Sequence, residues 1–420
     1  MLKKMGCDTM ASIRQRGKNS WQIIVSCGYD INGKKLTKPK TVKRPPGLTD
    51  KQWEKELKRI AIEFERQVET GDYYEPSKFT ISEFIDKWLE EHGKNLEVKT
   101  LYRYKGLLNG RIKAAMGHMK LDQVKPLHLL DFYRNLQENG IRKDGKEGGL
   151  SNKTIQHYHR VLSAMFESAV KWGMMKENPC SRVSPPKAER KEMHCLDEEG
   201  VSRLLECLEN ENIKNQAIIE LLLVTGCRRG EIAALQWDNV DLDKGIIHIK
   251  QAAVYTPSTG IVVKQPKTLS SVRKIKLPAS TIELLKNYRK YWLAEKIKVG
   301  DLWQKGDRER LGNAWHDPEW VFATWNGHIM HPDSFTDIFK KFIRKYNLPD
   351  IRLHDLRHTA ATLLINAGLN IRAVARRLGH ANANVTLGIY AHALESADEA
   401  AANVIEGYIK NQKPTQSNQA

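Results

Sequence analysis

The stretch "LHDLRHTAATLL" at residues 353–364 combines two features that do not belong together in an ordinary buried helix. From Thr359 on, its small and apolar residues predict a buried helix over about residues 355–367. The segment nevertheless begins with two histidines and Arg357, and no carboxylate follows Arg357 until Glu395. Because burying an unpaired charge is costly, the pattern predicts that Arg357 binds an anion.

The bulk composition indicates that this anion belongs to a large molecule. The chain has 420 residues, 40% of them hydrophobic, which predicts two or three domains with real cores. A net charge of +18 favours a polyanionic partner, with nucleic acid as the first candidate and an acidic membrane surface as the second. No apolar run approaches the roughly 20 residues that span a bilayer. Six scattered cysteines form no C-x-x-C pair, so we expect no zinc or disulfide framework and a reducing cytoplasm.

The first 46 residues carry half of the net charge, with eleven Lys or Arg and two acids. Apolar and polar side chains alternate over residues 20–44 around a "DING" turn, which predicts strands. Residues 48–71 predict a helix with Thr49 or Asp50 as its N-cap. A compact module over residues 1–75 follows, whose basic sheet suits a DNA groove, although a basic domain without that role would look similar. The basic side chains of this sheet are Arg14, Arg16, Lys18, Lys34, Lys35, Lys38 and Lys40.

Residues 76–180 predict an all-helical domain. Thr80 and Glu83 form a capping-box pattern, and apolar residues from Ile155 to Ala169 recur at helical spacing. Many basic residues lie on these helices, and as a set they would allow a face that grips DNA, although each alone is explained as a solvated charge. The candidates on this face are Lys99, Arg103 and Lys153.

The Pro-rich, charged residues 181–194 predict an interdomain linker. Residues 195–420 then form the largest domain, with a small antiparallel sheet expected within residues 245–277. Its helices are expected at about 197–209, 212–225, 279–297, 332–346, 355–367 and 371–378. The predicted fold class is therefore multidomain α+β: a small sheet-and-helix module, an all-helical domain, and a mostly helical domain with a small sheet.

Three further segments of the last domain carry reactive side chains. In "LLLVTGCRRGEIAALQW" (221–237) an apolar helix ends at Gly226, and Arg228 begins the next helix, three residues before Glu231. The segment "KQPKTLSSVRKIKLP" (264–278) predicts a β-hairpin with Lys267 in its turn. In "RRLGHANANVTLGIYAH" (376–392), His380 follows a glycine and a tyrosine follows ten residues later. Taken alone, Arg228 and Glu231 would be explained as a surface ion pair, Lys267 as a solvated lysine, and the tyrosine as a core residue.

Taken together, "TGCRRGEI", "PKT" in a hairpin, "HDLRHTAATLL", "LGH" and a downstream tyrosine followed by "AH" resemble the tyrosine recombinases, or phage-type integrases. The resemblance covers at least residues 195–395. The order of domains also resembles the integrases of phages and integrative elements. It implies that residues 1–75 bind arm-type DNA, that residues 76–180 bind the core site, and that residues 195–420 carry catalysis.

The resemblance assigns the charged candidates to the phosphate. Arg228 and Arg357 match the two arginines that clamp a phosphodiester, and Glu231 matches the acid that braces the first of them. Two guanidiniums suit this task because each offers a planar fork of donors to the non-bridging oxygens.

The remaining candidates match groups that move protons or attack phosphorus. Lys267 matches the general acid, and His354 and His380 match the two assisting histidines, whose division of labour the sequence leaves open. Tyr390 matches the nucleophile that forms a 3′-phosphotyrosyl link. Ten positions separate His380 from Tyr390, where nine is common in the family.

The segment 396–410 predicts a C-terminal helix with a short apolar patch. Packing of this patch on its own domain is one explanation. In the family the segment docks on a neighbouring protomer, which we favour. The patch consists of Val404, Ile405, Tyr408 and Ile409.

The resemblance implies a site-specific DNA recombinase that integrates and excises a phage or other mobile element. It would act as a homotetramer on double-stranded attachment sites, with an excisionase and a host DNA-bending protein as accessory partners, in the cytoplasm of a bacterial host at the nucleoid. Transesterification through a tyrosine needs neither metal nor ATP, so we expect no cofactor and no metal. Two alternatives are a DNA topoisomerase with the same chemistry, which needs no basic N-terminal module, and a DNA-binding regulator without catalysis, which needs none of the six matched groups.

Overall fold

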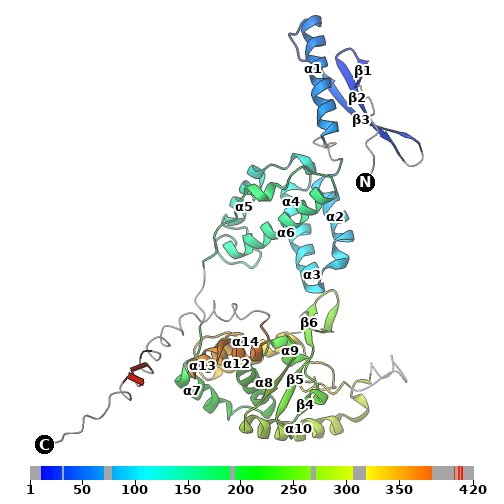
Figure 1. Ribbon diagram of the computed structural model, residues 1–420. Helices are drawn as coiled ribbons and strands as arrows, with labels where there is room; N and C mark the ends of the chain where they lie inside the picture. The colour runs from blue at the N-terminus through cyan, green and yellow to red at the C-terminus, as the bar shows by residue number, and fades with distance from the viewer. Residues whose placement is uncertain are drawn as a thin grey trace, which may run out of the picture. The chain divides into compact units, whose positions relative to one another are not determined.

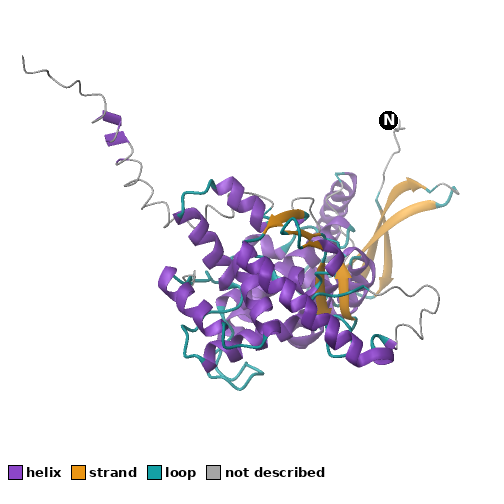
Figure 2. Cartoon of the chain, turned by 90° about the horizontal axis from the view of Figure 1, so that it is seen from below, coloured by secondary structure: helices purple, strands orange, loops and turns teal. Residues whose placement is uncertain are grey.

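The computed structural model describes residues 11–30, 33–70, 78–189, 194–265, 271–305, 318–380, and 402, 405, 406, 408 and 409. The chain divides into two compact units, residues 1–190 and 191–420. Helices dominate both units, and strands are confined to small antiparallel sheets (Figure 2), as the α+β prediction requires.

The N-terminal part of the first unit is a three-stranded antiparallel sheet covered by one helix (Figure 1). Ile23 and Val25 are fully buried on the sheet face that packs against the helix, which confirms the predicted alternation. Thr49 is the helix N-cap and forms a capping box with Gln52. The elements are β1 (Ser12–Gly17), β2 (Ser20–Tyr29), β3 (Lys35–Lys43) and α1 (Asp50–Glu69).

The rest of the first unit is helical and has a hydrophobic core of its own. Thr80 caps the first of these helices, and its side chain and backbone exchange hydrogen bonds with Glu83, as the capping-box pattern predicts. Ile155, Tyr158 and Leu162 lie in the core. The helices are α2 (Ile81–Glu91), α3 (Val98–Leu107), α4 (Lys113–Met116), α5 (Pro126–Gln137) and α6 (Asn152–Lys171).

The described beginning of the expected linker packs against these helices. A 3₁₀ turn over Pro179–Arg182 follows the helical region, and Val183 is buried in the same core. The backbone carbonyls of Pro186 and Lys187 accept hydrogen bonds from side chains of α6 at 3.0 and 2.9 Å. Chain up to Lys187 is therefore attached to the helical part, because its backbone groups find their partners there.

The second unit is built around the helix α8, which contacts α7, α10, α12 and α13 (Figure 1). Because consecutive residues of α8 from Ala217 to Leu223, with the exception of Glu220, are buried, it is the central helix of the core rather than a surface helix. All six helices predicted for this region are present within one or two residues of their expected bounds. The helices are α7 (Glu198–Leu208), α8 (Ile213–Thr225), α9 (Arg229–Ala233), α10 (Ala279–Val299), α12 (Pro332–Lys345), α13 (Asp355–Asn366) and α14 (Ile371–Leu378).

The strands of the second unit lie within residues 240–276, but they do not pair as the sequence suggested. The predicted hairpin over residues 264–278 is wrong, because β7 pairs with β6 and β8 pairs with β5. A tight turn between Thr256 and Gly260 closes β6 onto β7, whereas Ile275 of β8 is buried opposite Ile247 of β5. The strands are β4 (Val240–Asp241), β5 (Ile246–Ile249), β6 (Ala252–Thr256), β7 (Gly260–Lys264) and β8 (Arg273–Lys276).

Candidate active site

The turn between α8 and α9 positions Arg228. Gly226 ends α8 in the left-handed conformation, with φ of +59°, which is why a glycine stands here. Arg228 is then the N-cap of α9, and its guanidinium Nη1 donates to Glu231 Oε1 at 2.8 Å. Its backbone N–H donates to Glu231 Oε2 at 2.9 Å. The predicted Arg228–Glu231 pair is therefore confirmed, with the carboxylate 4% exposed and the arginine 44% exposed.

Arg357 lies on the first turn of α13 and points at the same turn. Its Nη1 donates to the carbonyl of Gly226 at 2.7 Å, and its side chain is almost fully buried. Within the described residues its Nη2 has no hydrogen-bond partner and its charge has no carboxylate partner. Burial, and then the charge of Arg228, lower the pKa of this guanidinium to about 10, so it stays charged at neutral pH. The prediction that Arg357 is buried is confirmed, and the described parts of the chain offer its charge no carboxylate.

Two histidines border the arginines. His354 is the N-cap of α13, and His380 directly follows α14. Burial lowers the pKa of each imidazole to about 4, and the positive charges of Arg357 and Arg228 contribute to both shifts. Both imidazoles are therefore neutral at neutral pH and can accept or donate a proton.

The C-terminal end of α14 closes the site next to Arg228. Gly379 has φ of +72°, and the N–H of His380 bonds to the carbonyl of Ala375, so the helix ends in a glycine-dependent cap. The carbonyl of Gly379 accepts a hydrogen bond from Arg228 Nη2 at 3.3 Å. The "LGH" motif thus places His380 beside the first arginine.

Four of the six predicted catalytic residues and the supporting acid therefore lie in one region of the second unit. The four are Arg228, His354, Arg357 and His380, and the acid is Glu231. Lys267 and Tyr390 lie outside the described residues. Since β7 ends at Lys264 and β8 begins at Arg273, the segment with Lys267 joins two different sheets.

The sequence reasoning missed Arg273, which is 4% exposed and lies on β8. Its Nη2 donates to Glu231 Oε2 at 2.9 Å. Burial would raise the pKa of the Glu231 carboxyl, but the hydrogen bond and charge of Arg273, together with Arg228, hold that pKa below its ordinary value. A signal was present, because Arg273 shares the strand face of Ile275 and Leu277, which are both buried.

A cavity of about 670 Å³ lies beside this cluster. Three of the residues that line it are arginines and one is a lysine, so the cavity favours an anion. Its lining is Val272, Arg273, Lys274, Arg372, Ala375, Arg376 and His380.

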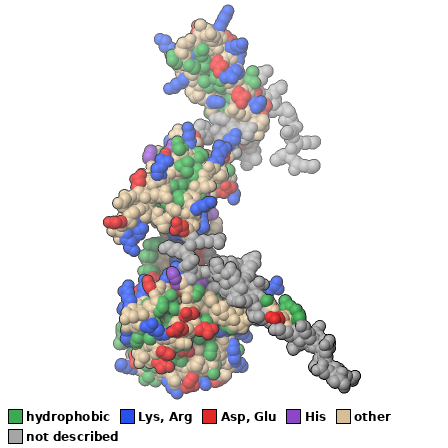
Figure 3. Space-filling view, turned by 90° about the vertical axis from the view of Figure 1, so that its left-hand side faces the viewer, with side chains coloured by type: hydrophobic (Ala, Val, Ile, Leu, Met, Phe, Trp, Pro, Cys, Tyr) green, Lys and Arg blue, Asp and Glu red, His purple; other side chains and the backbone are tan. Residues whose placement is uncertain are grey.

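The predicted DNA contacts of the first unit fall on several surfaces. Arg14 and Arg16 are exposed on β1, and Arg16 donates to Gln22 at 2.9 Å on the sheet face opposite the buried Ile23. Lys38 and Lys40 are only half-exposed and lie on the face that α1 covers, with the Lys40 ammonium 5.3 Å from the ring centroid of Phe64. Blue side chains project from several sides of this module in Figure 3. Lys18, Lys34 and Lys35 are exposed in or next to its turns.

On the helices of the first unit, Arg103 of α3 and Lys153 of α6 belong to one positive cluster. Burial and then the charges of Arg103, Arg160 and Lys153 lower the pKa of His157, which lies among them. Lys99 is exposed on α3. These placements allow a shared basic face on α3 and α6.

Residues 194–397 match the model of the phage integrase family, and residues 80–137 match the N-terminal SAM-like domain of phage integrases. The chain belongs to the phage integrase family. It is a tyrosine-type site-specific recombinase, as the motifs predicted.

Relatives of this integrase-family chain cover nearly its whole length. It is 27% identical to a tyrosine recombinase XerC-like protein of Caldanaerobacter subterraneus subsp. tengcongensis, over 90% of this chain and 94% of the relative. It is 24% identical to the ICEBs1 integrase of Bacillus subtilis, over 95% of this chain and all of that protein. Among solved structures, the Tn1549 transposon integrase has a TM-score of 0.62 at 23% identity, over 78% of this chain and all of that one. This structural similarity shows that the fold is that of an integrase.

Two further properties of the described residues concern membranes and metal ions. None of the helices in the described parts is long and apolar enough to cross a membrane. Among the same residues, no group of three or more His, Cys, Asp or Glu side chains is arranged to hold a metal ion.

Proposed function

We propose that this integrase inserts and excises a mobile element by cutting and rejoining double-stranded DNA at attachment sites. The observation that carries the proposal is the pair Arg228 and Arg357, two guanidiniums in one region. The Nη2 of Arg357 is buried and finds no partner among the residues that the structure describes. A phosphodiester has two non-bridging oxygens that share one charge, and it satisfies such a pair. Relatives are named as integrases and transposases of mobile elements, which supports the same role here.

The chemistry follows from the groups at the site. The oxygen of Tyr390 attacks phosphorus, the bond from phosphorus to the 5′-oxygen breaks, and a 3′-phosphotyrosyl link forms. Lys267 protonates the leaving 5′-oxygen, and a neutral His354 or His380 takes the tyrosyl proton or donates to the phosphate. Charge that builds on the phosphate oxygens is met by Arg228 and Arg357, each of which typically contributes a few kcal/mol to the transition state. Attack by a 5′-hydroxyl of the partner strand reverses the step on new DNA, without metal or ATP.

The domain roles are part of the same proposal. Residues 1–75 bind arm-type DNA and residues 76–180 bind the core site, ahead of the linker 181–194 and the catalytic residues 195–420. The positive cluster around His157 supports the core-site role, because it offers several charges to the phosphate backbone on one face. Solved structures of this fold include the Tn1549 transposon integrase and a lambda integrase dimer, both determined in complex with DNA.

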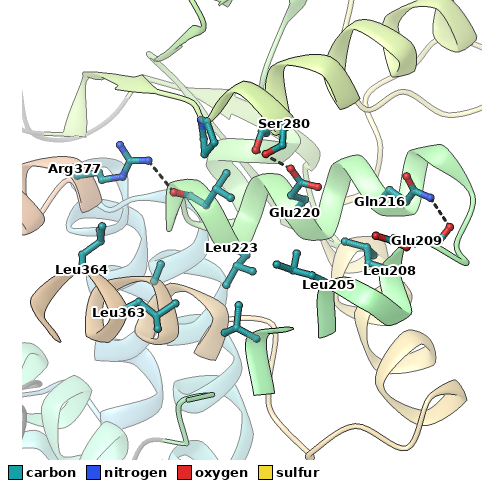
Figure 4. Close-up of a pocket in the computed structure, with 15 residues that line it drawn as sticks. Leu205, Leu208, Glu209, Gln216, Glu220, Leu223, Ser280, Leu363, Leu364 and Arg377 are labelled. Atoms are coloured by element: carbon teal, nitrogen blue, oxygen red, sulfur yellow. Dashed lines mark hydrogen bonds between the residues drawn. The ribbon is translucent and has the colours of Figure 1, made fainter. Parts of the chain in front are cut away.

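We further propose a tetramer held together by the C-terminal segment. Ile405, Tyr408 and Ile409 are 60 to 71% exposed, which is unusual for three large apolar side chains in one short stretch. The second unit has a cavity of about 510 Å³ with Leu205, Leu223 and Leu363 along it (Figure 4). Glu209 and Glu220 also border it and suit the lysines that follow Ile409 in the sequence. Docking of this segment into the cavity of a neighbouring protomer would fill that cavity and link the protomers. The assembly would act at the nucleoid of a bacterial host.

The test uses a nicked suicide substrate that contains the attachment site of the element and traps the covalent complex. The unmodified chain is expected to form an adduct that denaturing gels resolve. Tyr390→Phe should form none, while Tyr291→Phe, which removes the hydroxyl of an exposed tyrosine on α10, should form the adduct normally. An adduct with Tyr390→Phe would refute the nucleophile. Relaxation of supercoiled plasmid that lacks the site would instead favour the topoisomerase, and binding without any nicking would favour the regulator.

A further inference from the structure

The buried Arg273 uses its guanidinium entirely inside the protein. Its side chain is 4% exposed. Nε donates to the carbonyl of Arg377 at 2.6 Å, and Nη1 donates to the carbonyl of Ser271 at 3.0 Å. Nη2 donates to Glu231 Oε2 at 2.9 Å and lies 3.2 Å from the Cys227 sulfur. Four of the five N–H groups of this guanidinium thus have partners inside the protein, so its main contacts are with the protein itself, although it also borders the cavity of about 670 Å³.

Its first effect is on Arg228. The Glu231 carboxylate is shared, with Oε1 bonded to Arg228 Nη1 and Oε2 bonded to both Arg273 Nη2 and the backbone N–H of Arg228. Because a planar guanidinium fixes the plane of the carboxylate it binds, Arg273 sets the direction in which Oε1 holds Arg228. It also neutralises Glu231, so Arg228 keeps its charge available for a phosphate. Without Arg273, the acid would be compensated by Arg228 alone.

Its second effect is on the end of α14. The carbonyl that accepts from Nε belongs to Arg377, two residues before Gly379. A Cβ on Gly379 would lie 2.7 Å from Nη1, so the backbone there packs directly against the guanidinium. Gly379 in turn accepts the hydrogen bond from Arg228, and His380 follows it. One buried side chain therefore connects β8, the Glu231–Arg228 pair and the residue before His380.

We infer that Arg273 is a positioning residue for strand cleavage, which orients Arg228 through Glu231 and fixes the α14 end that carries His380. The inference rests on the proposed function, since it assigns a role in that reaction. A misplacement of about 1 Å at a reacting group can cost on the order of 100-fold in rate. Loss of the guanidinium is therefore expected to slow cleavage while DNA affinity, which depends on many other contacts, stays within about twofold.

The experiment is a double-mutant cycle in the full-length chain. Single-turnover cleavage of the suicide substrate and DNA affinity by fluorescence anisotropy are measured for Arg273→Met, Glu231→Gln and the double variant. Arg273→Met is expected to cleave roughly 10- to 100-fold more slowly. The double variant should be slowed no more than about threefold beyond the slower single variant, because both changes remove one connected unit. Tyr288→Phe, which removes a buried 2.8 Å hydrogen bond elsewhere in the same unit, is the matched control and should cleave normally.

Three results would overturn the inference. One is normal cleavage by Arg273→Met, and another is a double variant whose loss equals the product of the two single losses. The third is a loss that appears only as weaker DNA binding. If Arg273→Met does not fold, Arg273→Lys carries the same cycle, because it keeps the charge and reaches fewer acceptors. Absence of cleavage by the unmodified chain would instead refute the proposed function, and this inference with it.

Discussion

A methyl group added at Gly226 would test how tightly the phosphate site is built. This residue ends α8 with φ of +59°, and its carbonyl accepts a hydrogen bond from the Arg357 guanidinium at 2.7 Å. A Cβ at this position would lie 2.4 Å from a methyl carbon of Leu378 and 3.6 Å from the Cβ of Ala360. Leu378 is fully buried at the end of α14, so moving its methyl carbon away would disturb the packing around it.

The structure separates two costs of Gly226→Ala. A non-glycine residue in the left-handed region costs about 1 kcal/mol. Overpacking against a buried side chain adds about 1–3 kcal/mol. Gly368 provides the matched control, since it has φ of +79° and nothing within 4 Å of an added Cβ. Gly368→Ala should therefore show only the first cost, and Gly226→Ala should be less stable than it by about 1–3 kcal/mol.

The assay is urea unfolding of the full-length chain, with hydrogen exchange of peptides from α8 and α13 read by mass spectrometry. This readout follows the second unit by itself, which matters because a chain of several domains does not unfold in one step. We also expect Gly226→Ala to slow cleavage, because a shifted carbonyl turns Arg357. Equal destabilisation by Gly226→Ala and Gly368→Ala would refute the packing argument.

Three further outcomes are expected. Burial lowers the pKa of His354 and His380 to about 4, whereas histidine in an unfolded chain titrates near 6.5, so the unfolded state binds more protons between these pH values. The second unit should therefore lose stability as the pH falls from 7 toward 4. His354→Gln should reduce the dependence of melting temperature on pH, and an unchanged dependence would contradict the pKa shift. Arg103→Ala or Lys153→Ala should lower the slope of log K for DNA binding against log salt concentration by about 1. The control Lys94→Ala should change this slope less, because the Lys94 ammonium already pairs with Glu91. If all three variants changed the slope equally, the basic face on α3 and α6 would be excluded. Deletion of residues 1–75 should leave cleavage of a core site intact and impair complete recombination in a plasmid assay, and unimpaired recombination would count against arm binding.

Much of the architecture was predictable because local patterns and core packing agree. The helix α8 and its glycine stop followed from an apolar run and one turn residue, and the capping box at Thr80 followed from Glu83 three residues later. The sequence left the N-cap of α1 open between Thr49 and Asp50, and the structure shows Thr49 there. The pairing of β8 with β5 was not predictable in the same way. Strands adjacent in sequence favour a hairpin, but here burial of Ile275 against Ile247 decided the partner.

The sequence by itself determined the elements, the charge and the identity of the motif residues, because each depends on neighbours within a few positions. It also indicated that Arg357 is buried without a carboxylate. Only the tertiary structure decided that Arg273 shares Glu231 with Arg228 across 42 positions, and that the carbonyls of Gly226 and Gly379 hold the two arginines. Such contacts arise when whole helices and strands pack, and no local periodicity specifies which buried donor meets which acceptor.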